Sequence, residues 1–479
     1  MISRHSTGEI MINYLRITLL AALMLTLTGC HDGTSDPTVD SFNVEITLQS
    51  DAGISLDDLH YYLFEYPVAP DLEDIRNIYP NLGPAAELVT LPALSADFEQ
   101  AYTEQPDNNT LTFNSIPTAD YVLWVEGNTV PTQRFLIRAE VDNPVVRIRS
   151  GSVIEGLNLQ SDTTLTLNIY EVTEEIVVGD GVTLTIAEGT ELRFAPDVGI
   201  TVDGGRLHIS SSAGQPVLFL GREEIVGDPH WQGIRLHDPI EPFQLDRALF
   251  MHADTALAFT AGGDISLSNS IFVDNGCALH GEGDFQLSNL RFSYNDNAIS
   301  VVAGTVDLSG SIFLLQSDNG LKAGPNCRLQ LENNWFEACY RALDLEEHCR
   351  GVITQNVFSG MTETVRLDTP DSLDISFNTF HATELLDFRL TFTAVDDTLY
   401  IQENNLLRGN LLNPILTVVS HAPADLSLDL RFNYWHTTSS VLIESHFQIT
   451  GNVEPDILPL ALELIPAAGP WGNYPYGIH

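Results

Sequence analysis

Leu331-Glu332-Asn333-Asn334-Trp335-Phe336 is the clearest copy of a motif that recurs through the C-terminal half of this 479-residue chain. Each copy begins with an aliphatic residue and has a second large apolar residue five positions later. The nine copies are Leu245/Phe250, Leu267/Phe272, Leu287/Phe292, Leu308/Phe313, Leu331/Phe336, Ile353/Phe358, Ile375/Phe380, Ile401/Leu406 and Leu430/Trp435. Their first residues lie 22, 20, 21, 23, 22, 22, 26 and 29 residues apart. A period in the twenties predicts a stacked solenoid, in which each turn closes its core only against its neighbours.

The apolar positions inside each repeat indicate strands rather than helices. Another apolar residue stands two positions before the first one in eight of the nine copies, with Gly351 as the exception, so the pattern alternates with period two. One more aliphatic residue follows about twelve positions after the first, as at Leu343 and Val365. Asn occupies the second or third position after the first residue in most copies, where a turn needs tolerance of left-handed backbone angles. Three short strands and three turns per repeat describe an all-β triangular prism filled with Leu, Ile and Phe.

This pattern resembles the right-handed parallel β-helix family, the architecture of pectate lyases and of many bacterial surface proteins. Residues 182–194 and 199–209 are similar to the opening turns of bacterial members, and Asn433-Tyr434-Trp435 followed by residues 454–459 resembles their closing turn. The resemblance is specific for the fold because many spaced positions agree. It implies no particular activity, since enzymes and non-enzymes share this fold.

These boundaries place the β-helix at residues 150–460 and a tail rich in Gly, Pro and aromatic residues at 461–479. The tail is predicted to cover the open end of the stack, whose strand edges would otherwise be unpaired. Residues 42–149 have strand-like runs at irregular spacing, with Pro-rich and acidic loops, which predict a small antiparallel β-sandwich. Within it, residues 111–125 resemble the strand–turn–strand of transthyretin-like or carboxypeptidase-regulatory-like modules, which usually act as spacers.

The N-terminus resembles a bacterial lipoprotein signal. An apolar run at residues 17–27 is shorter than the about 20 residues that a membrane span needs. It ends in Leu27-Thr28-Gly29-Cys30, which matches the lipobox, so the resemblance implies a signal peptide at residues 1–29 and acylation of Cys30. The small polar residues at 30–41 then form a lipidated tether. An ordinary secretory signal with a chance cysteine is the alternative.

The implied location is the cell envelope, with the membrane as a partner through the lipid on Cys30. His31 follows the cysteine where the inner-membrane retention signal has Asp, so the resemblance favours the outer membrane.

The charge balance excludes one class of partner. The chain has 65 acidic and 21 basic residues, a formal net charge of −44, and Lys322 is its only lysine. Nucleic acid is not expected as a partner, since a basic face is the usual footprint of such binding. Acidic polysaccharides would be repelled over most of the surface, which counts against a polyuronate lyase. The acidity is equally compatible with a salty habitat or with divalent-cation binding.

Two of the five cysteines occupy equivalent positions. Cys327 and Cys349 each stand four residues before the first residue of a repeat, so they should lie on adjacent turns. Neighbouring strands are about 4.8 Å apart, within the Cα range that a disulfide accepts. We predict that this pair is bonded or at least in contact; two buried free thiols are the alternative. Cys277 and Cys339 are several turns apart and should not pair.

Motifs with a known chemistry are scarce. The chain has no His-Glu-x-x-His, Gly-x-Ser-x-Gly, phosphate-loop or Cys-x-x-Cys sequence. Asp228 and His230 resemble part of the Asp-Pro-His-Asp motif of alginate epimerases, but Trp231 replaces the last carboxylate. We therefore name no catalytic residue, metal ligand or cofactor, and Ca²⁺ is a possibility without support. The acidic pairs at 57–58 and 396–397 are interpreted as solvated surface.

A basic group for lyase chemistry is available, but no motif singles one out. The candidates are Arg291, Lys322, Arg341 and Arg366.

Two functional hypotheses remain from the sequence. The first is a non-enzymatic envelope lipoprotein whose β-helix binds a glycan or a surface partner, or serves as a structural scaffold. The alternative is a polysaccharide-active lyase, epimerase or hydrolase anchored at the cell surface. An enzyme should gather two carboxylates and a basic group in one groove. A common cleft for Asp228, His230, Arg235 and His237 would favour the enzyme.

Overall fold

The computed structural model describes residues 41–465 apart from several gaps. The longer gaps are 66–100 and 222–229, and the shorter ones are 118, 120, 129, 138–142, 213–214, 239–240, 261–262, 382–385, 393–397, 408–414, 422–425, 436–438, 452, 459 and 462–464. The predicted signal peptide, Cys30 and nearly all of the tether lie outside the described residues, as does most of the tail at 461–479. Within the described ranges, no helix is both long and apolar enough to cross a membrane.

Two small sheets form between residues 41 and 148. The first consists of β4 (Thr110–Pro117), β1 (Ser41–Ser50) and β7 (Val145–Ile148), and the second of β3 (Tyr102–Glu104), β2 (His60–Glu65), β5 (Tyr121–Gly127) and β6 (Val130–Ile137), in these orders. The second sheet is antiparallel, as expected. In the first sheet, however, β1 and β7 run parallel. No tight hairpin joins these two strands, so nothing forces them to run antiparallel.

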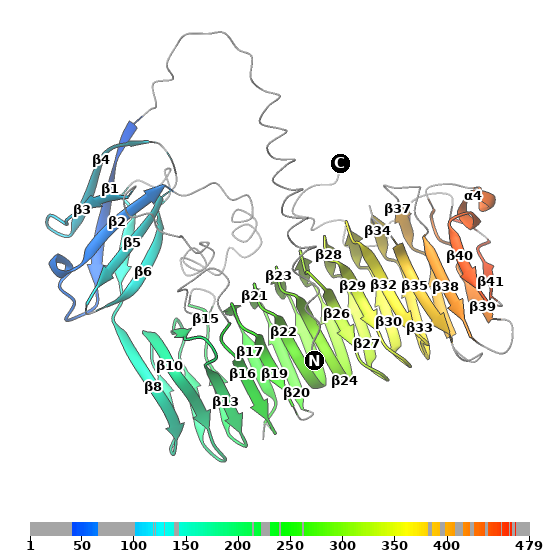
Figure 1. Cartoon of the computed structure of the whole chain (residues 1–479), viewed down its shortest axis with the longest axis horizontal. Helices are drawn as coiled ribbons and strands as arrows, with labels where there is room; N and C mark the ends of the chain where they lie inside the picture. The colour runs from blue at the N-terminus through cyan, green and yellow to red at the C-terminus, as the bar shows by residue number, and fades with distance from the viewer. Residues whose placement is uncertain are drawn as a thin grey trace, which may run out of the picture. The chain divides into compact units, whose positions relative to one another are not determined.

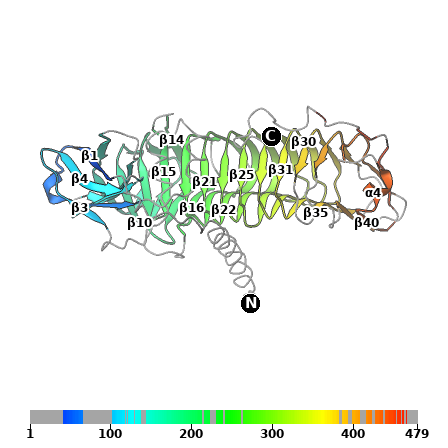
Figure 2. The ribbon, with the colours of Figure 1, turned by 90° about the horizontal axis from the view of Figure 1, so that it is seen from above.

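From Gly151 onward the chain winds into a right-handed parallel β-helix (Figure 1). The strands β27, β28 and β29 make up one turn, and each pairs in parallel with the equivalent strand of the next turn, β30, β31 or β32. We call the resulting sheets the first, second and third sheet, after the order of β27, β28 and β29 in the chain. Seen from above, β30, β31 and β35 lie in three different rows, one for each sheet (Figure 2).

The three sheets extend through most of the chain. The first contains β9 (Thr163–Leu165), β11 (Thr183–Ile186), β14 (Arg206–Ile209), β17 (Phe243–Asp246), β20 (Asp264–Ser268), β27 (Arg328–Glu332), β30 (Arg350–Thr354), β33 (Ser372–Ser376), β36 (Thr398–Gln402), β39 (Leu426–Asp429) and β41 (Val453–Asp456). The second contains β12 (Glu191–Phe194), β15 (Val217–Gly221), β18 (Ala248–Met251), β21 (Ile271–Val273), β23 (Arg291–Ser293), β25 (Ile312–Leu314), β28 (Trp335–Glu337), β31 (Val357–Ser359), β34 (Thr379–His381) and β37 (Asn405–Leu407). The third contains β13 (Gly199–Asp203), β16 (Gly233–His237), β19 (Thr255–Phe259), β26 (Asn319–Ala323), β29 (Arg341–Leu345), β32 (Glu363–Asp368), β35 (Leu386–Phe392), β38 (Leu416–Ser420) and β40 (Phe447–Thr450).

A few elements fall outside this scheme. Four long strands each contribute to two sheets: β8 (Gly151–Leu159), β10 (Ile169–Val178), β22 (Cys277–Ser288) and β24 (Asn297–Ser309). Two short helices are described, η1 (Leu56–Asp58) among the N-terminal strands and α4 (Ser440–Glu444) before β40.

The equivalent apolar residues of successive repeats pair with one another in the structure, as the sequence predicts. Leu331 pairs with Ile353 in the first sheet, and the same column runs from Leu245 to Ile401. Phe336 pairs with Phe358 in the second sheet. In the third sheet, Leu343 pairs with Val365. The predicted fold class is therefore confirmed at the level of individual residues.

The column in the second sheet is a stack of aromatic rings inside the prism. Its buried members are Phe250, Phe272, Phe292, Phe313, Phe336, Phe358 and Phe380. Successive ring centroids lie 4.3 to 5.2 Å apart, with interplanar angles of 6° to 19°. Because this distance matches the spacing of about 4.8 Å between strands, each Phe stacks on its equivalent without leaving its place in the turn.

The asparagines that follow each first residue have two distinct roles, which the sequence interpretation had merged. The second position is the left-handed one, as at Asn269 (φ 49°), Asn289 (φ 51°) and Asn333 (φ 56°). The third position points inward and forms a buried ladder of Asn334, Asn356, Asn378, Asn404 and Asn433.

Asn356 shows how a member of this ladder bonds to a neighbouring turn and to its own turn. The Asn356 Oδ1 accepts the Asn334 backbone N–H at 2.9 Å and its side-chain Nδ2 at 3.0 Å. The Asn356 Nδ2 in turn donates to the carbonyl groups of Leu331 and Thr354, at 3.0 and 2.9 Å. The ladder therefore satisfies the buried backbone groups of a turn that water does not reach.

Replacing Asn356 by Ala is expected to lower the free energy of unfolding by about 2 to 4 kcal/mol. The reason is that buried backbone groups of residues 331, 334 and 354 lose a partner, at about 1–3 kcal/mol for each unsatisfied group. Urea unfolding followed by circular dichroism measures the change. Asn333→Gly is the matched control, because glycine accepts the left-handed angles at that exposed turn. A loss at Asn356 no greater than at Asn333 would contradict the structural role of the ladder.

Candidate functional site

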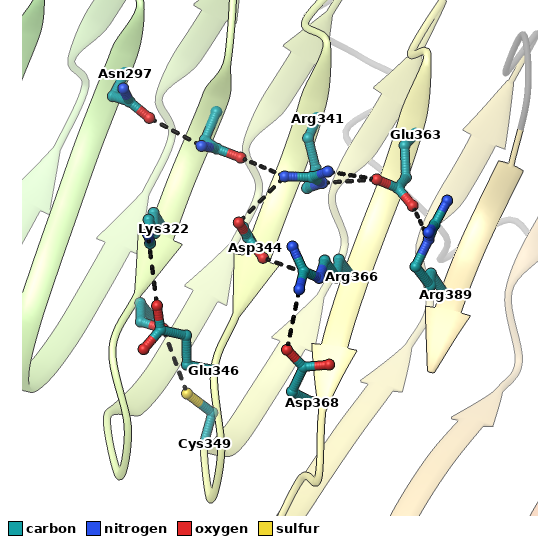
Figure 3. Close-up of polar contacts among 12 residues, drawn as sticks. Asn297, Lys322, Arg341, Asp344, Glu346, Cys349, Glu363, Arg366, Asp368 and Arg389 are labelled. Carbon is teal, nitrogen blue, oxygen red and sulfur yellow. Dashed lines mark hydrogen bonds and ion pairs between the residues drawn. The ribbon is translucent and has the colours of Figure 1, made fainter. Parts of the chain in front are cut away.

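The third sheet has a row of charged side chains on its outer surface (Figure 3). In β26, β29 and β32, the buried residues Leu321, Leu343 and Val365 point inward. Because side chains alternate along a strand, the residue that follows each of them points outward. These residues are Lys322, Asp344 and Arg366, and Arg389 of β35 continues the row. We call the set Lys322, Arg341, Asp344, Glu346, Glu363, Arg366, Asp368 and Arg389 the charged face.

Arg341 lies at the centre of the charged face and connects three turns. Its Nη2 and Nε donate to Glu363 Oε2 of the next turn at 2.6 and 2.8 Å. Its Nη1 donates to Asp344 Oδ2 at 3.1 Å and to Asn319 Oδ1 of the preceding turn at 3.2 Å. The side chain is only 12% exposed. Arg341 is therefore held in one orientation by groups on both sides.

Two carboxylates lie beneath the surface of the charged face. The side chains of Asp344 and Glu363 are 11% and 7% exposed. Burial raises the pKa of Asp344 although Arg341, Arg366 and Lys322 favour its ionised form. Burial also opposes the charge of Arg341, but Glu363 and Asp344 outweigh it and raise the pKa of this guanidinium. The network is thus a partly buried set of charges that depend on one another.

The outer part of the charged face is accessible. The side chains of Arg366 and Arg389 are 41% and 55% exposed. Arg366 approaches Asp344 Oδ1 at 3.8 Å and Asp368 Oδ2 at 3.4 Å. Arg389 Nε lies 2.5 Å from Glu363 Oε1. Tyr340, which is 47% exposed, stands beside the network, with the Arg341 Cζ 5.5 Å from the centre of its ring.

This arrangement combines fixed hydrogen-bond donors and acceptors with one exposed aromatic ring. Such groups suit the recognition of a polar ligand, because they are already oriented before the ligand arrives. Asp344 and Glu363 are each shared between two arginines. Neither is therefore an unengaged carboxylate of the kind that acts as a general base.

The sequence interpretation found part of this site. It named Lys322, Arg341 and Arg366 as separate basic candidates, and the structure brings these three together. It missed Asp344, Glu346, Glu363, Asp368 and Arg389. Lys322, Asp344 and Arg366 are spaced by 22 residues and each follows the third apolar residue of a turn, so aligning that position would have revealed the row.

The other residues that the sequence singled out do not converge. Arg291 is buried, with its Nε donating to Ser293 Oγ at 3.2 Å. Trp335 of the repeat motif is buried as well. Asp228 and the acidic pair at 396–397 lie outside the described residues.

The proposed cleft of His230, Arg235 and His237 is not supported by their contacts. His230 lies beside Asp254, with Nδ1 4.0 Å from Oδ1. Arg235 pairs instead with Glu175 at 2.6 Å. His237 Nδ1 contacts Thr260 Oγ1 at 2.6 Å. Each of the three side chains thus has its own separate partner.

The cysteines in the described ranges are free thiols: Cys277, Cys327, Cys339 and Cys349. Cys327 and Cys349 do precede the paired residues of β27 and β30, on successive turns. The two cysteines are not bonded to each other in the structure, although Cys349 interacts with Cys327, so the bond stays a prediction. Cys349 Sγ lies 3.3 Å from the carbonyl oxygen of Gly324, and Cys327 bonds the backbone of Gly304.

One pocket of about 440 Å³ lies away from the charged face, between β14 and β17. The hydrogen bonding of the first sheet is interrupted there, since its opening strands β9, β11 and β14 pair with one another but not with β17. Its oppositely charged lining residues Arg206 and Glu241 bond each other at 2.8 Å. These two charged side chains of the pocket lining are therefore already paired with each other.

Comparison with known proteins adds a partial family match. Residues 262–414 match the family model described as the periplasmic copper-binding protein NosD. This stretch includes the whole charged face but less than half of the chain. No curated protein matches the chain. One similar solved structure is the family 28 exopolygalacturonase of Yersinia enterocolitica, with 9% identity, coverage of 83% of this chain and 94% of that chain, and a TM-score of 0.34. A similarity of this size carries no information about activity.

The described residues do not fit a copper site. They contain no group of three or more His, Cys, Asp or Glu side chains placed to hold a metal ion. His230 and His252 lie one above the other, with ring centroids 6.5 Å apart. Their carboxylate neighbours are different residues, Asp254 and Asp274 respectively. For the same reason, Ca²⁺ remains without support in the part of the chain that the structure describes.

Asp344→Asn and Glu191→Gln are expected to change stability in opposite ways as pH rises. The pKa of Asp344 is raised above 3.8, mainly by burial. Its contribution to stability is therefore fully present below that pH and is lost as pH rises through the raised pKa. The Asn variant should consequently gain stability relative to the wild type from pH 3.8 upward, and at neutral pH be at least as stable.

Glu191 provides the matched comparison. Burial opposes its ionisation, but Arg193 and Arg149 outweigh burial and lower its pKa below 4.5. Its contribution is therefore present above pH 4.5 and lost as pH falls through the lowered pKa, so Glu191→Gln should destabilise the protein at neutral pH. Urea unfolding at a series of pH values tests both variants. If both variants lost the same free energy of unfolding at neutral pH, the charge of Asp344 would be shown to stabilise the folded protein, contrary to this expectation.

The thiols give a further expected outcome. Burial raises the pKa of Cys327 to about 11 and that of Cys339 and Cys349 to about 12, so alkylation should be slow in the native protein. After unfolding without reductant, each cysteine of residues 41–479 should gain one label, which mass spectrometry counts. If the unfolded protein instead carried two labels fewer than expected, and gained them once reductant was added, a bond between Cys327 and Cys349 would be established.

Proposed function

We propose that this protein is a non-enzymatic binding scaffold of the bacterial cell envelope and that it holds a glycan along the charged face. The observation that supports the proposal is the exposed Tyr340 ring beside a fixed network of Arg341, Asp344 and Glu363. A sugar presents hydroxyl groups that need both donors and acceptors, and C–H faces that pack on aromatic rings. Both kinds of partner occur together at this place.

The rigidity of the site favours binding. Its side chains come from three paired strands, β29, β32 and β35. Arg341 has partners on its own turn and on both neighbouring turns, so little rotamer freedom is left to lose when a ligand binds. A long ligand lying along the sheet would meet equivalent positions about every 4.8 Å, the spacing of the strands.

The proposed location rests on the sequence and on the family match. Leu27-Thr28-Gly29-Cys30 supplies the lipidation signal, with Cys30 as the anchor and the outer membrane as its destination. The family that matches residues 262–414 is described as periplasmic, which agrees with the cell envelope. Copper binding is not part of the proposal, because the described residues offer no group that fits the metal.

One observation favours the alternative, a polysaccharide-active enzyme. Asp344 is a buried carboxyl group whose pKa is raised, as is typical of a general acid. However, Asp344 Oδ2 accepts from Arg341 at 3.1 Å and Oδ1 faces Arg366 at 3.8 Å. Both oxygen atoms are thus directed at protein groups, and the scaffold remains the better-supported function.

A glycan panel tests the proposal with the soluble protein from His31 onward. Binding to neutral and acidic polysaccharides is measured together with the appearance of reducing or unsaturated ends. We expect binding without new ends. Tyr340→Ala should weaken it by about two- to tenfold, the value of one aromatic contact. Tyr400→Ala is the matched control, since Tyr400 is similarly exposed but belongs to β36 in the first sheet.

New ends that appear with turnover and disappear in Asp344→Asn would overturn the scaffold in favour of the enzyme. Neither binding nor product from any polysaccharide would remove glycans from the proposal and leave a structural role.

A further inference from the structure

Arg366 and Arg389 are placed directly opposite each other on adjacent strands of the charged face. They are paired residues of β32 and β35. Like charges opposite each other in a sheet destabilise it. The pairing is notable in a chain that has only 21 basic residues against 65 acidic ones. Because basic residues are rare in this chain, two of them at paired positions are unusual.

Carboxylates of the charged face lie beside both arginines, close to Arg389 and at longer distances from Arg366. Glu363 holds Arg389 through Nε at 2.5 Å. Arg366 is drawn to Asp344 and Asp368 through Nε and Nη2. Glu363 and Asp344 also serve Arg341, so neither fully neutralises its outer arginine.

Several donors of this pair have no partner among the described residues. Both Nη groups of Arg389 and the Nη1 group of Arg366 form no hydrogen bond or ion pair with the described residues. Two of the guanidinium–carboxylate distances of Arg366, at 3.4 and 3.8 Å, also exceed the about 2.7–2.9 Å of a strong charge-assisted hydrogen bond. The outer edge of the charged face thus has guanidinium donors that the carboxylates of the face leave unused.

A second pair of opposed arginines on the first sheet shows what is particular to this one. Arg328 and Arg350 are paired residues of β27 and β30. Arg350 has only the exposed Asp371 at 3.9 Å, and no buried carboxylate lies among its described partners. These side chains are free to spread into solvent, so their opposition does not imply a ligand.

We propose that Arg366 and Arg389 together bind one carboxylate or sulfate group of an acidic glycan. The inference rests on the proposed function and names the class of glycan. Strands are about 4.8 Å apart, so two guanidinium groups on adjacent turns can bracket a single anionic group and donate to different oxygen atoms. The ligand's charge relieves the repulsion between the two arginines. Elsewhere on this acidic surface the same group is repelled, which confines it to this place.

Matched polymers separate the charge of the ligand from its backbone. The probes are polygalacturonate and alginate, each beside its carboxyl-reduced, neutral form. The wild type should bind the acidic polymers about tenfold more tightly or better, as expected for one charge-assisted contact. Arg366→Gln and Arg389→Gln should each lose about tenfold for the acidic form and lose clearly less for the neutral form, so that the preference for the acidic polymer falls. Arg350→Gln is the control and should match the wild type.

Thermal unfolding shows whether a variant that loses affinity is still folded. Arg366→Gln should unfold close to the temperature of the ligand-free wild type, because losing the repulsion from Arg389 offsets losing the contacts with Asp344 and Asp368. An acidic oligosaccharide should raise the unfolding temperature of the wild type more than that of either variant.

Three outcomes would overturn the inference in distinguishable ways. Equal affinity for the acidic and neutral polymers would leave the scaffold function in place but remove the anion site. Binding of inorganic sulfate as tightly as the polymer, lost in Arg366→Gln, would assign the pair to a free anion instead of a glycan. Failure of every polymer to bind would remove the proposed function together with the inference.

Discussion

The parallel pairing of each turn with the next, in register, is the constraint on which the rest of this structure depends. Because Leu331 must pair with Ile353 and Phe336 with Phe358, every side chain lies on its equivalent in the neighbouring turns. Identical or compatible residues are therefore needed along each column, not just within each turn. The stacked Phe rings and the Asn ladder satisfy this requirement in the interior, with ring spacing and amide hydrogen bonds that match the distance between strands.

The same constraint acts on the outer surface, where its consequences are electrostatic. A charged residue in one turn inevitably meets the residue at the same position of the next turn. Lys322, Asp344 and Arg366 alternate in sign along one such column, and alternation is the arrangement that avoids repulsion. Arg389 breaks the alternation by following Arg366. That break marks the place where the column is no longer explained by the stability of the fold alone.

The sequence was sufficient to predict the apolar columns residue by residue. Apolar residues recur with a fixed period, and they are buried in the interior of the prism. It was less informative about polar residues, whose role depends on how deep they lie. Asn333 and Asn334 are neighbours of the same type, yet one occupies an exposed left-handed turn and the other a buried ladder. The charged face was found only in part for the same reason. Nothing in the local sequence distinguishes the buried Asp344 from the partly exposed Asp368, whereas the three-dimensional neighbours Arg341 and Glu363 lie 22 residues apart.

Burying Asp344 and Glu363 is difficult to explain as a means of stability. Partly buried ion pairs often contribute little to stability, because the loss of hydration offsets the attraction between the charges. The raised pKa of Asp344 indicates that its surroundings favour the neutral acid, even with Arg341 and Arg366 nearby. An apolar residue at this position would avoid that cost, as apolar residues do elsewhere in the prism. What the carboxylates do achieve is orientation: they fix Arg341 within the sheet and hold Arg366 and Arg389 at its surface. A network that sacrifices stability in order to orient exposed cations is better suited to recognising a ligand than to holding the solenoid together.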